Sequence, residues 1–328
     1  MRRSILAAGV AAAALGLVVL PSAATAHTGN LYTWAYNPQV TPDVSGFATT
    51  SKTDAALAFL GADTSSEIDS PSGVEICAET AYAVSTQGDA SVIVTWNHDT
   101  GALTSAPIDI TIEDGAIDGV FELDTLLDCT VLTLAGLSGD LPGLAVISVD
   151  PATGAAAVVA DLTEEPAEPT GIATNPSGAT YLFGDVEGTP SVATFDPSTG
   201  VIGEWVEQAG IGDEFESTGF TQGVDFDAAG GLWIVAGINN EEQYHLLSYA
   251  AGADLATSPV TDIGILPYYS TPQELQIQSP IPLATDGIAV VAPQLAATGA
   301  ELPLGVALGA GILLLCGLAL IAVRRRTA

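Results

Sequence analysis

Two pentapeptides, DPATG at residues 150–154 and DPSTG at residues 196–200, decide how the fold of this chain is interpreted. Each directly follows a short apolar stretch, VISV before the first and VATF before the second. An Asp side chain accepts hydrogen bonds from the backbone two residues on, Pro presets φ, and Gly takes the positive-φ position of a bulged hairpin. We therefore interpret both pentapeptides as β-hairpin turns, and we assign their Asp residues to turn formation and not to metal binding.

A second element alternates with these hairpins. It consists of a Gly that leads an apolar stretch, then a turn, then a second apolar stretch, and its clearest copy is GVDF at 223–226 followed by LWIV at 232–235. Further Gly-led copies begin at Gly73, Gly119, Gly171 and Gly287. Weaker copies of the hairpin are HDTG at 98–101, AAG at 250–252 and the stretch 32–38. One hairpin and one Gly-led element together take roughly 50 residues, close to the length of a four-stranded propeller blade.

The repeats predict an all-β fold, a single β-propeller of five blades over residues 27–292, or six if residues 255–282 contain another hairpin. The series begins with a hairpin and ends with a Gly-led element, so one blade must be completed by both ends of the chain, which hides free sheet edges. Tandem immunoglobulin-like domains would repeat at about 100 residues, whereas the turn glycines are spaced 46–53 residues apart. We also expect a short helix at 53–61 and a long loop at 266–282.

Charge restricts the possible partners of residues 27–298, which we expect to be exported for the reasons given below and call the exported part. Setting aside Glu301 leaves 38 of the 39 acidic residues there, against Lys52 alone, which is a net charge near −37. Such a surface repels nucleic acid, so nucleic-acid binding is excluded. It favours solubility, cation uptake or operation in high salt. The chain is 48% hydrophobic, so it can bury a core despite this charge.

Two cysteines, Cys77 and Cys129, fall in the exported part. An even pair in an oxidising compartment indicates a disulfide. In the propeller interpretation the two residues lie in corresponding inner regions of neighbouring blades. Their bridge would join two blades that otherwise meet only by packing.

The first 26 residues have the three parts of a secretory signal peptide. Two Arg precede the apolar run 5–20, and Ala-Thr-Ala ends at Ala26. We expect a signal helix here and cleavage between Ala26 and His27.

The opposite end carries LAATG, formed by Leu295, Ala296, Ala297, Thr298 and Gly299, within a linker and sorting segment at 293–299. An apolar run follows within 300–323, and a cationic tail occupies 324–328. The 22 uncharged residues at 302–323 are long enough for a transmembrane helix, and the three Arg after them favour a cytoplasmic tail. The alternative at this level is a simple membrane anchor that is never cut.

This order of segments resembles the sorting signal of sortase substrates, in the LAxTG variant of the LPxTG motif found in actinobacterial Gram-positive bacteria. The resemblance implies cleavage between Thr298 and Gly299 and transfer of the Thr298 carbonyl to peptidoglycan or another wall amine. It therefore implies a sortase as partner, the membrane through the C-terminal helix, and an extracellular location on the cell wall or membrane. Only three residues separate the last predicted strand from Leu295, a reach of about 10 Å, so the domain is expected close to the envelope.

No catalytic motif is present, and we assign no catalytic residue and no metal ligand. We expect no cofactor, because acidic loops on so anionic a protein need no ion. Calcium is the alternative left open, since acidic groups such as Asp225 with Asp227, or Asp213 and Glu214 with Glu216, could bind a divalent ion. Copper at an N-terminal His27 would need a second His, and His98 and His245 lie in separate modules.

Ligand contact is assigned to Tyr268 and Tyr269, because both lie in the predicted loop. The sequence thus favours a non-catalytic binding or structural propeller held close to the envelope. The alternative is a secreted propeller hydrolase or lyase that acts on sugars, lactones or cell-wall fragments.

Overall fold

The computed structural model describes residues 30–37, 44–61, 64, 67–211, 215–216, 223–238, 244–267, 276–277 and 283–285. Within these ranges the chain forms strands and turns and no helix, so the all-β prediction is confirmed. The expected signal and transmembrane helices, the signal cleavage site and the sorting motif lie outside the described residues. In the described ranges, no helix is long and apolar enough to span a bilayer.

The strands form five sheets, which we number as blades I to V. Blade I contains β24 (Ala284–Thr285), β1 (Asn30–Asn37), β2 (Val44–Ser51), β3 (Leu57–Phe59) and β23 (Gln276–Ile277). Blade II contains β4 (Gly73–Cys77), β5 (Thr80–Gln87), β6 (Ala90–Trp96) and β7 (Ile108–Asp109). Blade III contains β9 (Gly115–Thr125), β10 (Val131–Gly139), β11 (Leu144–Val149), β12 (Ala155–Asp161) and β8 (Thr111–Ile112), the last paired in parallel with β12.

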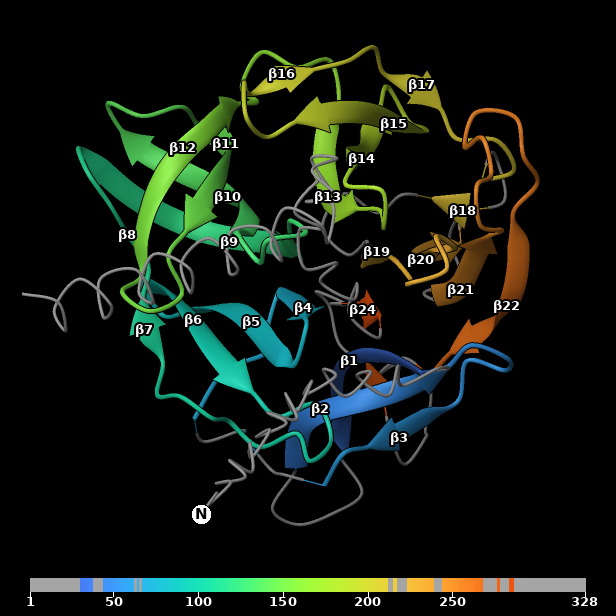
Figure 1. Ribbon diagram of the computed structural model, residues 1–328, viewed down its shortest axis with the longest axis horizontal. Helices are drawn as coiled ribbons and strands as arrows, with labels where there is room; N and C mark the ends of the chain where they lie inside the picture. The colour runs from blue at the N-terminus through green and yellow to red at the C-terminus, as the bar shows by residue number, and fades with distance from the viewer. Residues whose placement is uncertain are drawn as a thin grey trace, which may run out of the picture. The chain divides into compact units, whose positions relative to one another are not determined.

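Blade IV contains β13 (Glu168–Thr174), β14 (Thr180–Val186), β15 (Thr189–Asp196), β16 (Val201–Ile202) and β17 (Val206–Glu207). Blade V contains β19 (Val224–Phe226), β18 (Phe215–Glu216), β20 (Leu232–Ile238), β21 (Tyr244–Tyr249) and β22 (Thr261–Leu266). The innermost strands contact one another in the cyclic order β4, β9, β13, β19, β24 and back to β4, so the sheets surround one axis (Figure 1). The chain is a five-bladed β-propeller.

Blade I is completed by strands from both ends of the propeller region, as predicted. Residues Leu31 and Tyr32 of β1 pair with Thr285 and Ala284 of β24, and Ala35 pairs with Ile277 of β23. The division of blade I between the two ends of the chain differs from the expectation, because β1, β2 and β3 all come from the N-terminal part. The turn between the two outer strands lies at 51–56, and not near residue 37 as expected. The stretch 53–61 is not a helix. It contains this turn and β3, and the turn is closed by a hydrogen bond from the Ser51 amide to the Ala56 carbonyl (2.9 Å).

Five buried hydrophobic clusters fill the five spaces between neighbouring blades. Between blades I and II, the rings of Phe47 and Trp96 stack at 3.9 Å, and Trp34 meets Phe47 edge to face. Trp34, Trp96 and Trp233 are all buried in the clusters between blades. Because every blade buries apolar side chains on both of its faces, the ring is stable only when it is closed.

The DPxTG turns have the structure that their residues predict. Asp150 accepts hydrogen bonds from the Ala152 amide (2.9 Å) and the Thr153 hydroxyl (2.8 Å), and Gly154 has φ of 73°. The bond from Thr153 holds the pKa of Asp150 below its ordinary value. The equivalent bonds at Asp196 come from Ser198 and Thr199. Both Asp side chains are thus engaged in their own turns.

The turn glycines also pack against the outer strand of the preceding blade. A Cβ at Gly154 would lie 2.0 Å from the carbonyl oxygen of Asp109, and one at Gly200 would lie 2.4 Å from that of Val159. At Gly252, where φ is 72°, a Cβ would meet nothing within 4 Å. At Gly154 and Gly200, glycine is therefore needed both for the positive φ and for the close contact between blades. At Gly252 it is needed only for the positive φ.

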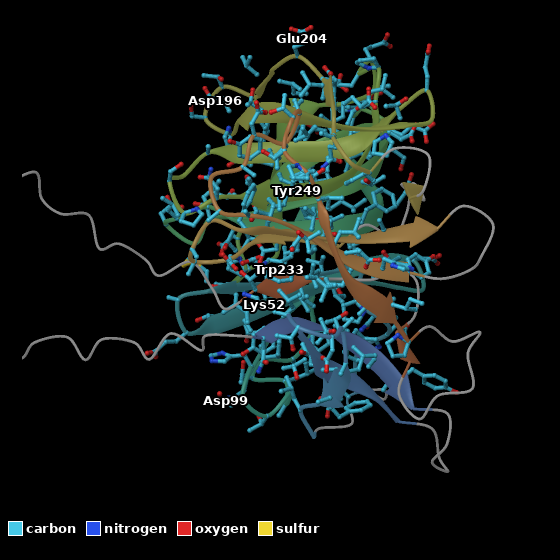
Figure 2. The ribbon with its side chains drawn as sticks, turned by 90° about the vertical axis from the view of Figure 1, so that its right-hand side faces the viewer. Lys52, Asp99, Asp196, Glu204, Trp233 and Tyr249 are labelled. Atoms are coloured by element: carbon cyan, nitrogen blue, oxygen red, sulfur yellow. A yellow bond between two sulfur atoms is a disulfide. The ribbon has the colours of Figure 1, made fainter. Side chains whose placement is uncertain are left out.

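Blades V and I are joined by an ionic contact. Lys52, just after β2, places its Nζ 3.2 Å from Oδ2 of Asp227 and 5.1 Å from the ring centroid of Trp233 (Figure 2). Trp233 in turn donates its Nε1–H to Asp227 (3.0 Å). Among the described residues, Lys52 is the one Lys or Arg.

Replacing Gly200 or Gly252 by Ala tests the contact between blades. Both positions have φ near 71–72°, so both variants share the cost of a side chain in left-handed backbone, about 1–2 kcal/mol. Gly200→Ala also collides with Val159 and is expected to lose about 1–3 kcal/mol more. Free energies of unfolding from urea titration measure the difference, and equal losses would contradict the packing role.

Candidate cation site on the propeller axis

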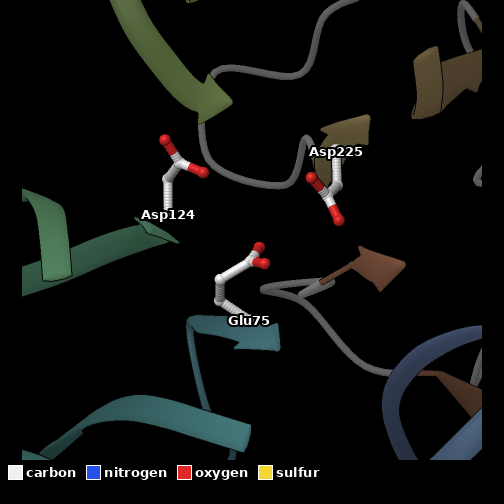
Figure 3. Close-up of side chains that lie close together, drawn as sticks. All are labelled: Glu75, Asp124 and Asp225. Carbon is white, nitrogen blue, oxygen red and sulfur yellow. The ribbon is translucent and has the colours of Figure 1, made fainter. Parts of the chain in front are cut away.

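Four acidic side chains from three blades converge on the propeller axis. They are Glu75 of β4, Glu122 and Asp124 of β9, and Asp225 of β19, and each residue is only 2–4% exposed. Figure 3 shows the carboxylates of Glu75, Asp124 and Asp225 pointing toward one another. One carboxylate oxygen from each of these three lies within 4.8 Å of the others.

Strand alternation explains why acidic residues reach the axis from apolar strands. Successive side chains of a strand point to opposite sides. Val74 and Ile76 pack in the cluster between blades I and II, which turns Glu75 of β4 away from that cluster. In the same way Val224 and Phe226 pack between blades IV and V, and Asp225 between them faces the axis.

The remaining two blades supply hydrogen-bond donors to the carboxylates. The Thr174 hydroxyl, from β13, donates to Oδ2 of Asp124 (2.6 Å). The Thr285 amide, from β24, donates to Oδ2 of Asp225 (2.6 Å), and the Phe226 amide donates to its Oδ1 (2.6 Å). Every blade therefore contributes at least one residue of its innermost strand to the axial group, and these bonds fix the orientation of two of the three converging carboxylates.

Burial raises the pKa values of all four carboxyl groups, and repulsion from neighbouring carboxylates raises those of Glu75, Glu122 and Asp225 further. Burial is the largest cause, and it raises the pKa of Asp124 to about 7. Burial and then the charge of Asp124 raise the pKa of Asp225 to about 8. The pKa values of Glu75 and Glu122 are also well above their ordinary range, again chiefly through burial. Near neutral pH the group thus holds protons unless another positive charge replaces them.

The chain supplies no side-chain cation to this group within the described residues. Lys52, the one Lys or Arg there, is bound to Asp227 near Trp233. His245 of blade V pairs with Asp262 (2.9 Å), and His98 lies beside Asp99 in blade II. Neutralisation of the axis is therefore left to protons or to a bound ion.

The sequence identified one member of the axial group and paired it wrongly. Asp225 lies on the axis, but Asp227 follows the end of β19 and accepts bonds from the Gly231 amide and from Trp233. Sequence reasoning missed Glu75, Glu122 and Asp124. The available signal was an acidic residue enclosed by apolar ones in a Gly-led strand, as in GVEI at 73–76 and GVDF at 223–226.

Other proposed site residues cannot be placed. Asp213, Glu214, Tyr268 and Tyr269 lie outside the described residues, and the Glu216 side chain is not described.

The predicted disulfide is present, with the Cα atoms of Cys77 and Cys129 5.6 Å apart. It joins the end of β4 in blade II to the turn after β9 in blade III, as expected for a bridge between neighbouring blades.

No protein-family model and no curated protein matches this chain. Among solved structures, it is similar to a gluconolactonase from Xanthomonas campestris, at 15% identity over 70% of this chain and 76% of the other, with a TM-score of 0.43. It is also similar to the periplasmic gluconolactonase of Pseudomonas aeruginosa (14%, 71% and 68%, TM-score 0.39) and to a protein from Lactobacillus plantarum (13%, 73% and 82%, TM-score 0.38). At these values the likenesses say nothing of what the chain binds or catalyses.

The raised pKa values predict that, with a chelator present, the protein loses stability as pH rises from 5 to 8. Between the ordinary and the raised pKa, the folded state holds more protons than the unfolded state, so the free energy of unfolding falls with pH. Glu75→Gln removes one of these groups and should flatten the fall. The control is Glu79→Gln, an exposed residue four positions on, which should follow the unaltered protein. Identical slopes in urea titrations for Glu75→Gln and the unaltered protein would contradict the assignment.

Proposed function

We propose that this chain is an exported β-propeller that binds one divalent cation on its axis and has a non-catalytic, structural or binding role at the cell envelope. The observation that carries the proposal is the convergence of Glu75, Asp124 and Asp225, one from each of three blades, with oxygens within 4.8 Å. Carboxylate oxygens suit hard cations, and calcium in particular accepts several of them in variable geometry.

Charge balance supports the proposal independently of distance. Several carboxylates buried together are unfavourable unless protons or cations compensate them. Among the described residues, the one Lys or Arg is engaged at Asp227, away from the axial group. A divalent cation would let these carboxylates ionise, so its binding releases protons and strengthens as pH rises.

A cation in this position would act as a cross-link between blades. β4, β9 and β19 belong to three different sheets and share no backbone pairing. Ligands from all three strands on one ion would connect the blades at their innermost points. Binding energy of this kind adds directly to the stability of the folded ring.

The location follows from the sequence of the two ends of the chain. A signal peptide ending at Ala26 and the LAATG motif at 295–299 support export followed by attachment to the wall through Thr298. The proposed partners are accordingly a sortase and a peptidoglycan amine. The alternative end state is retention in the membrane by residues 302–323.

The second candidate function is hydrolysis of sugars, lactones or cell-wall fragments. It is favoured by the pKa of Asp124, raised by burial to about 7, because a group that titrates near neutral pH is suited to general acid–base catalysis. A bound cation would add polarisation of a carbonyl group. The axial carboxylates are almost fully buried, which favours an ion-sized ligand over a sugar. Hydrolysis of lactone or glycoside substrates that disappears in Glu75→Gln would establish the enzyme.

Calcium is expected to stabilise the protein at pH 8. At 100 times its dissociation constant a ligand adds about 2.7 kcal/mol, which corresponds to a rise in Tm of about 5–10 °C for a domain of this size. Glu75→Gln should lose the rise, and Glu79→Gln should keep it. Differential scanning calorimetry with calcium and with chelator measures both. The cation proposal fails if the unaltered protein shows no shift with calcium, magnesium or manganese.

Sorting is tested on cells that produce the full chain. Mass spectrometry of cell-wall digests should find a peptide that ends at Thr298 and carries a peptidoglycan fragment. Thr298→Ala should remove this product and move the protein to the membrane fraction. Recovery of the chain with residues 302–323 still attached as the sole envelope form would instead establish the uncut anchor.

A further inference from the structure

The disulfide lies at one end of β4 and β9, the two strands that carry Glu75 and Asp124. Cys77 is the last residue of β4, and Cys129 lies in the short turn between β9 and β10. That turn is closed by hydrogen bonds from the Leu126 amide to the Thr130 carbonyl (2.9 Å) and from the Cys129 amide to the Leu126 carbonyl (2.8 Å). The position of Cys129 is therefore fixed relative to β9.

A second contact between β4 and β9 lies on the other side of the carboxylates. A Cβ on Gly73 would lie 2.5 Å from the Leu123 amide nitrogen, so the two backbones approach as closely as a glycine allows. Every second residue of β4 points to the same face, and the face toward β9 carries Gly73, Glu75 and Cys77. Glu75 thus lies midway between two fixed points, a glycine contact before it and a disulfide after it.

Cys129 occupies a turn position whose backbone conformation favours glycine. The equivalent turns of the next two blades, closed by the same pair of hydrogen bonds, have Gly178 and Gly230 at this position, with φ of 86° and 85°. Cys129 has φ of 64°, a left-handed conformation that disfavours any residue with a side chain. The chain replaces the favoured glycine by the one residue that can bond to Cys77.

We propose that Cys77 and Cys129 are positioning residues of the axial cation site, because their disulfide holds Glu75 against Asp124 at the spacing a shared ion requires. The inference rests on the proposed cation site and assigns the bridge a role in affinity beyond its role in stability. β4 and β9 share no backbone pairing, and their carboxylates repel each other. Without the bridge, the Gly73 contact and the apolar cluster between blades II and III are left to resist that repulsion, and the two ligands move apart in the ion-free state.

The test compares calcium affinity in variants with and without the bridge. Cys77→Ala combined with Cys129→Gly removes the disulfide and restores the glycine used by the equivalent turns, which preserves the fold of the turn. The control is Gly200→Ala, which weakens the outer contact between blades III and IV and leaves β4 and β9 unaltered. Isothermal titration calorimetry with calcium alone, at pH 8, measures the dissociation constant of each folded protein.

The double variant is expected to bind calcium about 10- to 100-fold more weakly, the range typical when supports of metal ligands are removed. Gly200→Ala should lose stability and keep the affinity of the unaltered protein. Reduction of the folded, unaltered protein with a phosphine should weaken binding to the same extent, and reoxidation should restore it, which makes the test independent of the double variant. Unchanged affinity after reduction, or an equal loss in Gly200→Ala, would overturn the positioning role while the cation site stands. If the oxidised, unaltered protein binds no calcium, the proposed cation site itself fails.

Discussion

Repulsion among buried carboxylates at the axis is the constraint on which the rest of this structure depends. Glu75, Glu122, Asp124 and Asp225 are enclosed with little exposure, and in the described residues no Lys or Arg accompanies them. The fold must therefore supply compensation by other means. It does so with protons, held because burial raises the pKa values, with the hydroxyl of Thr174 and the amide of Thr285, and, in our proposal, with a cation. A group of this kind is stable only while the surrounding ring stays closed.

Several kinds of interaction keep the ring closed. The five apolar clusters act over whole blade faces, and the turn glycines at positions 154 and 200 let outer strands meet at close distance. At the join of the two chain ends, β24 pairs with β1 in blade I and also donates to Asp225 of blade V. The last described strand therefore belongs at once to the closing sheet and to the axial group. Loss of that strand would open the ring and expose the carboxylates together.

Residue types and their regular spacing predicted most of the fold, and they failed for the outer turn of blade I and for the axial group. The DPxTG turns, the blade repeat and the disulfide were predicted, because each depends on residue types within a short stretch or on their regular spacing. The outer turn of blade I was placed near residue 37, because residues 51–56 contain no Pro or Gly to mark it. Asp225 was paired with Asp227, its neighbour in sequence, although its partners Glu75 and Asp124 lie 150 and 101 residues earlier. Only the closed ring brings those residues together, and no local pattern encodes that distance.

The single Lys52 has a consequence for resistance to proteases. Proteases of the trypsin type cut after Lys or Arg, and residues 53–323 contain neither. The one basic residue of the propeller is held between Asp227 and Trp233, with its amine engaged at both. Digestive enzymes of that specificity thus find one peptide bond to attack between residues 4 and 323, the one after Lys52, even in a molecule that has lost its fold.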